Sequence, residues 1–185
     1  FRANSADQSV ATNLMAGYSA ERFGMVANAA VRKTNRIRAG EGLDSHAAVT
    51  RFLGVSSDKL MDARLPDTEF LQYGGLMKFN WTPTSSDQFV VSYSRNQQDD
   101  GKRYDQLLGG DGNLIADLQD VMMDALYVKY NRAGLGIFDQ VTATYSFNTQ
   151  REERVNQGGN GNPAASITHE YERMYAQGFQ VKGVA

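Results

Sequence analysis

Two neighbouring runs of period-two alternation, joined by a short turn, constrain the fold of this chain most strongly. In the run 70–81, apolar side chains such as Phe79 occupy every second position on one side, and the run 88–97 repeats the pattern. Between them, 82–87 holds Pro83 with Thr, Ser and Asp, which is typical of a turn. The alternation predicts strands with one face in apolar and one in polar surroundings. The result is a hairpin, which needs further strands beside it.

The same alternation recurs along the rest of the chain. It predicts an all-β fold, an antiparallel up-and-down meander of about seven long strands. Strands of about ten residues exceed the five or six typical of soluble sheets and suit tilted membrane strands. The predicted strands are 10–19, 23–34, 70–81, 88–97, 120–131, 138–149 and 166–185.

Alternation also predicts which side chains share a face of the sheet. A slip of one residue would move every side chain of a strand to the other face, so each strand can be tested separately. The convex face is expected to carry Leu71, Met77, Phe79, Val91, Leu126, Val128, Val141 and Tyr145. The concave face is expected to carry Asn80, Ser92, Ser94, Thr142 and Thr144.

The connections between the predicted strands are alternately short and long. Outer-membrane barrels show this asymmetry, with short periplasmic turns and long extracellular loops. The first long connection also contains capping residues that predict two short helices. Short turns are expected at about 20–22, 82–87 and 132–137, and long connections at about 35–68, 98–119 and 150–165.

Aromatic side chains flank every predicted short turn. This favours the aromatic girdle of a membrane barrel at one membrane surface. The alternative is that these rings fill one end of a soluble sandwich core. The flanking residues are Tyr18 and Phe23, then Phe79, Trp81 and Phe89, then Tyr130 and Phe138.

Composition excludes several classes of protein. A net charge of -2 provides no basic surface for nucleic acid. The chain has no Cys for a disulfide framework, and no apolar run of about 18 residues for a membrane-spanning helix. The mean hydropathy of -0.49 does not exclude a membrane barrel, because half of each barrel strand is polar. Since the chain begins at Phe1 without a Met, we expect it to be a piece of a longer protein.

The segments 79–83, 89–94 and 144–147 resemble strands of TonB-dependent outer-membrane receptors. They read Phe-Asn-Trp-Thr-Pro, Phe-Val-Val-Ser-Tyr-Ser and Thr-Tyr-Ser-Phe. The resemblance extends over about residues 8–185 and consists of strand pattern rather than a specific motif. It implies that 1–185 is a fragment of a 22-stranded transmembrane β-barrel in the outer membrane of a Gram-negative bacterium. The predicted strands would be about its second to eighth.

The resemblance also implies a function. Receptors of this family bind a scarce, bulky nutrient, such as an iron-siderophore, haem or cobalamin, and import it actively. The implied partners are the lipid bilayer, a plug domain, TonB acting through a TonB box, and a small-molecule metal complex. Neither plug nor TonB box matches any part of this sequence. A passive porin-like channel is the alternative, and a soluble β-sandwich carbohydrate-binding module is a weaker one.

Four residues in or beside the long connections are candidates for ligand binding: Arg103, Tyr104, Arg151 and Arg154. Guanidinium groups suit an anionic metal complex, and an aromatic ring can stack on it. The alternative is solvated loop charge, which the two glutamates between Arg151 and Arg154 support.

Four further polar residues are expected to line the lumen of the barrel and to contact the plug: Arg32, Lys78, Asn80 and Lys129. Each lies on the polar side of its strand's alternation. In the alternative, these side chains are simply exposed to solvent.

No metal site, cofactor site or catalytic site is predicted. His46 and His169 stand alone, without triad or zinc spacing. An acidic cluster in one connection lacks the spacing of an EF-hand loop. We therefore expect a protein that is not an enzyme and holds no cofactor. The acidic cluster consists of Asp99, Asp100, Asp105, Asp111 and Asp117.

Overall fold

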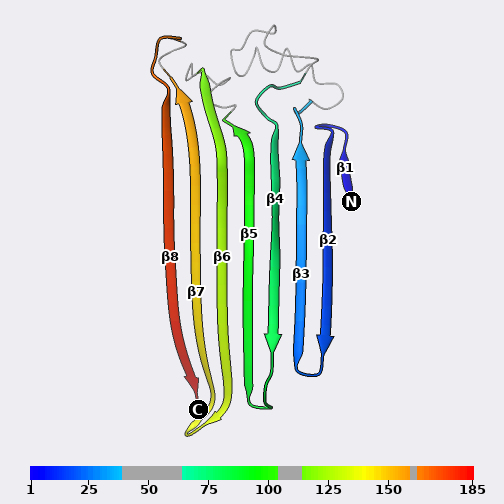
Figure 1. Cartoon of the computed structure of the whole chain (residues 1–185), viewed down its shortest axis with the longest axis vertical. Coiled ribbons are helices and arrows are strands. Elements are labelled where there is room, and N and C mark those ends of the chain that lie inside the picture. The colour runs from blue at the N-terminus through cyan, green and yellow to red at the C-terminus, as the bar shows by residue number, and fades with distance from the viewer. Residues whose placement is uncertain (39–63, 104–113, 159–161) are drawn as a thin grey trace.

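The described part of the chain forms one antiparallel sheet. The computed structural model describes residues 1–38, 64–103, 114–158 and 162–185. These ranges contain eight strands and no helix, and each strand pairs with the next along the chain (Figure 1). The prediction of an all-β antiparallel meander is confirmed. The strands are β1 (Arg2–Asn4), β2 (Ser9–Ala20), β3 (Phe23–Thr34), β4 (Phe70–Trp81), β5 (Asp87–Lys102), β6 (Ile115–Leu135), β7 (Phe138–Gln157) and β8 (Thr168–Val184).

The structure adds one strand to the seven that alternation predicts. The extra strand, β1, pairs with the first residues of β2. A strand of three residues is too short to show a period, so the sequence pattern does not reveal it. Side chains shape the turn that follows it. The backbone N–H of Ala6 donates to Asn4 Oδ1 at 3.1 Å, and the backbone N–H of Ser9 donates to Asp7 Oδ1 at 3.0 Å.

The strands beside the long connections run further than predicted. β5 ends at Lys102, β6 begins at Ile115 and β7 ends at Gln157, so parts of the second and third predicted connections are strand. In the extension of β7, charged side chains occupy both faces, so the period of two disappears while backbone pairing continues. A β-bulge between Leu118 and Asp120 shifts the register of β6 against β7.

Two other connections also deserve comparison with the prediction. One is shorter than predicted, and the other extends beyond the described residues. The third short turn is tighter than predicted, and Gly134 and Gly136 beside it have φ of 63° and 61°. Glycine adopts this left-handed conformation more readily than residues that have a side chain. The helices predicted within 35–68 lie almost wholly outside the described ranges. At the described ends of that connection, Arg38 and Arg64 form an isolated β-bridge.

Cross-strand register divides the side chains between two faces. Residues paired across antiparallel strands share a face, and the pairs link Phe79 to Val91, Val128 and Tyr145. We call this the apolar face, and the face that carries Asn80 the polar face. All the residues predicted to share a face do so, and the two predicted sets lie on opposite faces.

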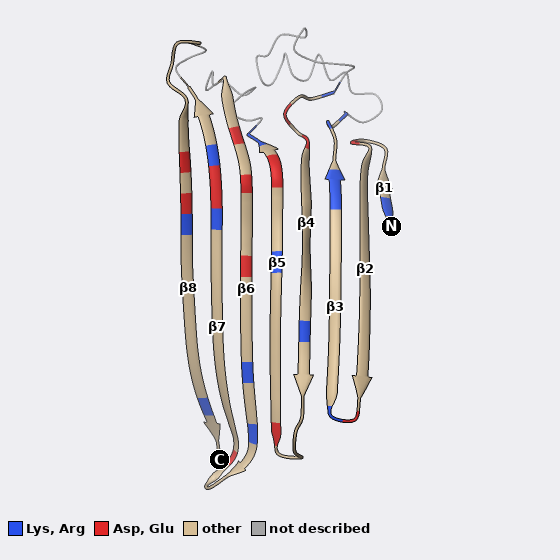
Figure 2. Ribbon diagram, in the orientation of Figure 1, with Lys and Arg blue, Asp and Glu red and all other residues tan. Residues whose placement is uncertain are grey.

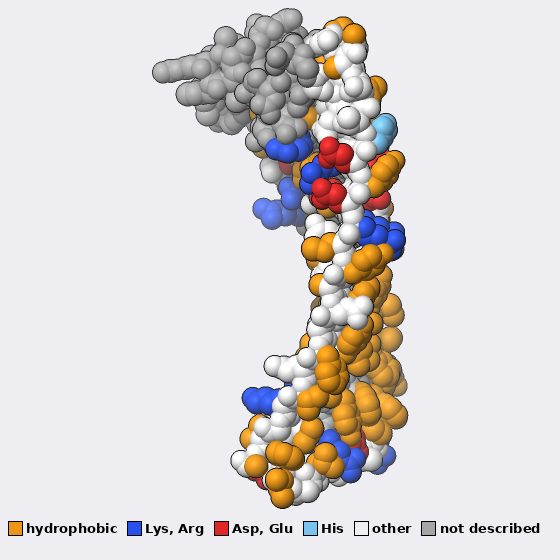
Figure 3. Space-filling view, turned by 90° about the vertical axis from the view of Figure 1, so that its left-hand side faces the viewer, with side chains coloured by type: hydrophobic (Ala, Val, Ile, Leu, Met, Phe, Trp, Pro, Cys, Tyr) orange, Lys and Arg blue, Asp and Glu red, His pale blue; other side chains and the backbone are white. Residues whose placement is uncertain are grey.

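The sheet is a single layer with almost no core among the described residues. In these ranges, the buried hydrophobic residues are only Ala116, Met122 and Val155. Large apolar side chains are exposed instead, with Leu14 76% and Phe179 75% accessible. Seen from the β8 edge, hydrophobic side chains gather on one side of the sheet (Figure 3). Because an apolar face must pack against something, another medium or layer has to cover this side.

Gly74 in β4 permits a close approach of β5. A Cβ at this position would lie 2.4 Å from the carbonyl oxygen of Arg95. We predict that Gly74→Ala lowers the free energy of unfolding by about 1–3 kcal/mol, because the backbone must shift to accommodate the methyl group. Gly24→Ala in β3 is the matched control, since its Cβ would meet nothing closer than 4.0 Å. Denaturant titration measures both variants, and equal stabilities would contradict the prediction.

Candidate functional site: an apolar band and a polar hollow

The apolar face carries a band of uncharged, mostly apolar side chains that crosses β2 to β8 near the short turns. It consists of three rows of cross-strand neighbours, which we call the apolar band. None of the residues in these rows is charged, and the charged residues of the described strands concentrate toward the strand ends (Figure 2). The row nearest the turns contains Ala20, Phe23, Trp81, Phe89, Tyr130, Ala143 and Val181. The middle row contains Tyr18, Met25, Phe79, Val91, Val128, Tyr145 and Phe179, and the third contains Ala16, Ala27, Met77, Tyr93, Leu126, Phe147 and Gln177.

Aromatic rings contact one another along the turn side of the band. The ring centroids of Phe89 lie 5.5 Å from Trp81 and 4.7 Å from Tyr130, and Phe23 lies 4.5 Å from Phe79. Such pairs add stability beyond the area that they bury. These rings lie on an open sheet surface, and no second layer of the described residues packs on them.

Asp87 ends the band on the side of the short turns. Its Oδ1 accepts hydrogen bonds from Tyr130 Oη at 2.6 Å and from Arg132 Nη1 at 3.0 Å. Its Oδ2 accepts one from Thr84 Oγ1 at 2.6 Å. The ring of Tyr130 therefore belongs to the band, while its hydroxyl belongs to a polar cluster outside it.

Asp124 ends the band on the side of the long connections in a similar way. Its Oδ1 accepts a hydrogen bond from Tyr93 Oη at 2.7 Å and lies 3.9 Å from Arg95 Nε. Neither polar edge was predicted from the sequence. The period of two already places both edges on the face of Phe89, because Asp87 lies two residues before Phe89 and Arg95 lies six residues after it.

The polar face is hollowed in the half nearer the long connections. The hollow has a volume of about 830 Å³ and is open to solvent. Neutral amides form much of its lining, including Asn96 and Gln150, and Gln72 Nε2 donates to Gln98 Oε1 at 3.0 Å. Amides donate and accept hydrogen bonds, and apolar side chains such as Leu76 and Met123 also line the hollow, so this surface offers both polar and apolar contacts.

The four residues predicted to line a lumen all lie on the polar face. Lys129 pairs with Val90, which pairs with Asn80, so these three are cross-strand neighbours. Lys78 lies two residues before Asn80 on the same strand, and Arg32 contributes to the hollow. Asn80 Oδ1 also accepts a hydrogen bond from a glutamine of β5 at 3.0 Å.

The residues predicted to bind a ligand are not brought together. Arg151 and Arg154 lie within β7 rather than in a loop, and their odd spacing places them on opposite faces. Arg151 is on the apolar face, whereas Arg154 is on the polar face beside Glu152, with which it forms an ion pair. Arg103 directly follows β5, and its backbone N–H donates to a carbonyl of β6 at 2.7 Å. Tyr104 lies outside the described residues.

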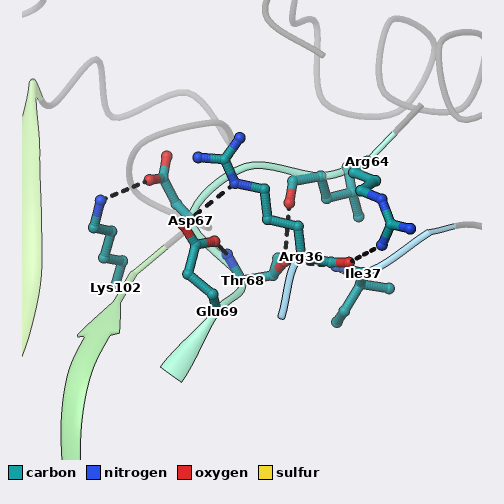
Figure 4. A network of polar contacts seen from close by, with 8 residues as sticks. Arg36, Ile37, Arg64, Asp67, Thr68, Glu69 and Lys102 are labelled. Atoms are coloured by element: carbon teal, nitrogen blue, oxygen red, sulfur yellow. Dashed lines mark hydrogen bonds and ion pairs between the residues drawn. The ribbon is translucent and has the colours of Figure 1, made fainter. Parts of the chain in front are cut away.

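A polar network joins the two described ends of the first long connection (Figure 4). Arg36 Nε lies 3.3 Å from Glu69 Oε1, and the backbone N–H of Ile37 donates to Thr68 Oγ1 at 3.0 Å. Lys102 Nζ at the end of β5 donates to Asp67 Oδ1 at 3.2 Å. These contacts thus join the two described ends of the connection to each other and to the end of β5.

The described ranges show no cluster of residues suited to a metal ion and no membrane-crossing helix. No group of three or more His, Cys, Asp or Glu side chains in them is placed to hold a metal. Of the acidic cluster singled out in the sequence, Asp105 and Asp111 lie outside these ranges. No helix within the same ranges is long and apolar enough to cross a membrane.

Comparisons with known proteins returned no match to a family model, to a curated protein or to a solved structure.

Glu69 is expected to make the stability of the polar network depend on pH. Burial raises the pKa of its carboxyl, but hydrogen bonds from a backbone amide and from Arg36, with the charge of Lys102, outweigh this and hold the pKa below its ordinary 4.5. The folded state then loses stability as the pH falls through that lowered pKa, by about 1 kcal/mol or less. Unfolding titrations between about pH 6 and about pH 3 measure the slope.

The variant Glu69→Gln should remove this part of the pH dependence. Glu21→Gln, in the exposed turn between β2 and β3, is the control, because it removes a carboxylate that lies outside the network. A wild-type slope retained in Glu69→Gln would show that the pair with Arg36 does not contribute to it.

Proposed function

We propose that the apolar band contacts the hydrocarbon core of the outer membrane of a Gram-negative bacterium, and that the chain belongs to the transmembrane β-barrel of a TonB-dependent receptor. The observation that carries the proposal is the band itself: a solvent-accessible, uncharged zone that crosses seven strands and is bounded in β5 and β6 by an ion pair on each side. In water, a continuous apolar surface of this extent is unfavourable. In a bilayer, it is the surface that a barrel strand requires.

The height of the band supports contact with the hydrocarbon core of a bilayer. Its polar edges, Asp87 and Arg95, are eight residues apart in β5, which is about 27 Å along the strand at about 3.4 Å per residue. For strands tilted by about 40°, this is about 20 Å along the membrane normal. The apolar zone of outer-membrane barrels is about 25 Å tall. Tyr130 and Tyr93 also suit the two membrane surfaces, since each has its ring in the band and its hydroxyl in a polar cluster.

The proposal assigns an environment to each remaining part of the sheet. The apolar face would be convex, and the polar face would line a lumen, where Arg32, Lys78, Asn80 and Lys129 would contact a plug domain. The short turns would face the periplasm, and the long connections would face the outside of the cell. The unpaired edges of β1 and β8 would pair with further strands of the barrel.

Active import is proposed over passive diffusion because of the resemblance and the long connections. Long connections in compact proteins are often functional, and a receptor for a scarce ligand uses them for binding. The ligand would be a bulky nutrient such as an anionic iron complex. Arg154, Arg32 and the amides of the hollow lie on the polar face, which would line the lumen, so they are the residues to test for ligand contact. Arg151 lies on the apolar face, which would contact lipid.

Val128 is the residue whose substitution tests the membrane contact most directly. It lies in the middle row of the band, whereas Val141 shares the edge row with Arg132. We predict that Val128→Arg costs about 2–4 kcal/mol of folding free energy in the membrane and reduces assembly of the full-length protein. Its neighbour Tyr127→Arg is the matched control, because it places the same charge on the polar face. Folding into lipid vesicles measures both, and equal losses would contradict a lipid-facing band.

Uptake by cells distinguishes a receptor from a passive channel. A deletion strain complemented with the full-length gene should take up the iron complex only while the proton gradient is intact. Uptake that persists after the gradient is collapsed would favour the porin-like channel. Arg154→Ala should weaken uptake at low ligand concentration if it contacts the ligand, and Arg151→Ala should leave it unchanged.

A further inference from the structure

Two arginines face each other across β7 and β8 on the apolar face. Arg151 and Arg173 are direct register partners. Like charges in this position repel each other and destabilise a sheet. Neither guanidinium forms an ion pair with any residue in the described ranges, and both side chains are exposed. Such an arrangement is favourable when an anion lies between the two groups.

The pair lies directly beyond the apolar band. Arg151 is two residues past Thr149, which pairs with Asp124, the residue that ends the band in β6. This step is about 7 Å along the strand, or about 5 Å along the membrane normal at a tilt of about 40°. The headgroup layer of a bilayer extends about 5–8 Å beyond the hydrocarbon core. In the proposed orientation, both guanidinium groups therefore lie at the depth of the lipid phosphates of the outer leaflet.

Aromatic contacts hold one of the arginines in place. The guanidinium carbon of Arg173 lies 4.8 Å from the centroid of the Tyr175 ring, which in turn lies 6.2 Å from Phe147 in the band. A cation over an aromatic face is attracted to it, and the planar guanidinium keeps its N–H groups free at the edge. Arg173 is thus oriented at the border between the band and the polar region.

No carboxylate in the described ranges forms an ion pair with either arginine, although Asp120 and Glu153 lie one row beyond the pair on the same face. Asp124 lies near Arg95 and accepts from Tyr93. Glu153, two residues beyond Arg151 on the same face, pairs in register with Tyr171. At the edge of the apolar band near the short turns, by contrast, the arginine is paired: Arg132 forms an ion pair with Asp87 at 3.0 Å.

We infer that Arg151 and Arg173 form a binding site for the phosphate group of an outer-leaflet lipid. Each guanidinium has a fork of N–H donors that matches two phosphate oxygens, and a phosphate between them would offset their repulsion. The acyl chains of such a lipid would lie along the apolar band beside Phe147 and Phe179. This inference depends on the membrane contact proposed above.

The test measures lipid binding to the full-length protein in detergent by native mass spectrometry. The probes are lipid A, which carries two phosphates, and phosphatidylcholine, with inorganic phosphate as competitor. Arg151→Gln/Arg173→Gln should bind lipid A at least about tenfold more weakly than the wild type, since two charge-assisted contacts are lost. Lys78→Gln/Lys129→Gln, which removes the same charge from the polar face, should bind it like the wild type. Arg151→Lys/Arg173→Lys, which keeps the charge without the fork, should be intermediate.

The outcomes separate this inference from the function proposed above. Unchanged lipid A binding in the Gln variant, or equal weakening in the Lys78 and Lys129 control, would overturn the site. Displacement of lipid A by an equal concentration of inorganic phosphate would also overturn it, because the site would then hold free phosphate. Failure of the wild type to enter lipid vesicles would refute the membrane contact itself. If the Gln variant does not assemble, the Lys variant still tests the site. A lipid A affinity of the Lys variant equal to that of the wild type would argue against bidentate binding by the two arginines.

Discussion

A sheet one layer thick has no interior, and the rest of this structure depends on that constraint. Hydrogen bonds between neighbouring strands establish the register, but they bury few side chains. The apolar side chains that would form the core of a two-layer domain remain on the surface. The surroundings of the sheet must therefore provide the stabilisation that a core normally provides. Such a sheet is expected to be more sensitive to its solvent than a globular domain of equal length.

Alternation lets a single strand serve two environments at once. Lys129 lies between Val128 and Tyr130 in sequence, yet it points away from the band that both neighbours form. Lys78 has the same position between Met77 and Phe79 in β4. A charge can therefore lie one residue from an apolar surface without entering it. This explains why a chain with a mean hydropathy of -0.49 has a continuous uncharged band.

The middle of each strand could be predicted from the sequence because the two faces differ there. Phe79 and Asn80 were assigned to opposite faces, and the register confirms this. At the loop ends, the predictions were less accurate, since both faces of β7 become polar and the pattern carries no period. Arg151 and Arg154, predicted to lie in or beside a long connection, consequently belong to a strand and lie on its opposite faces.

The hollow of the polar face could not be predicted from any one segment. Gln72 and Gln98 meet because β4 and β5 pair in one particular register, and Gln150 joins them from β7. Amides distributed over separate strands give no local signal. Arg32 was singled out correctly as a polar-face residue, but nothing in its own strand indicates the amides opposite it.

The polar network joins the two described ends of the first long connection, and this affects which connecting segments the sheet can accept. The bridge between Arg38 and Arg64 and the pairing of Arg36 with Glu69 hold the chain at two fixed points. Whatever segment joins these points begins and ends in the same place. Doubling the length of a flexible segment between fixed ends costs only about 0.6 kcal/mol. A sheet anchored in this way can exchange one connecting segment for another of different length and chemistry while its own strand register is retained.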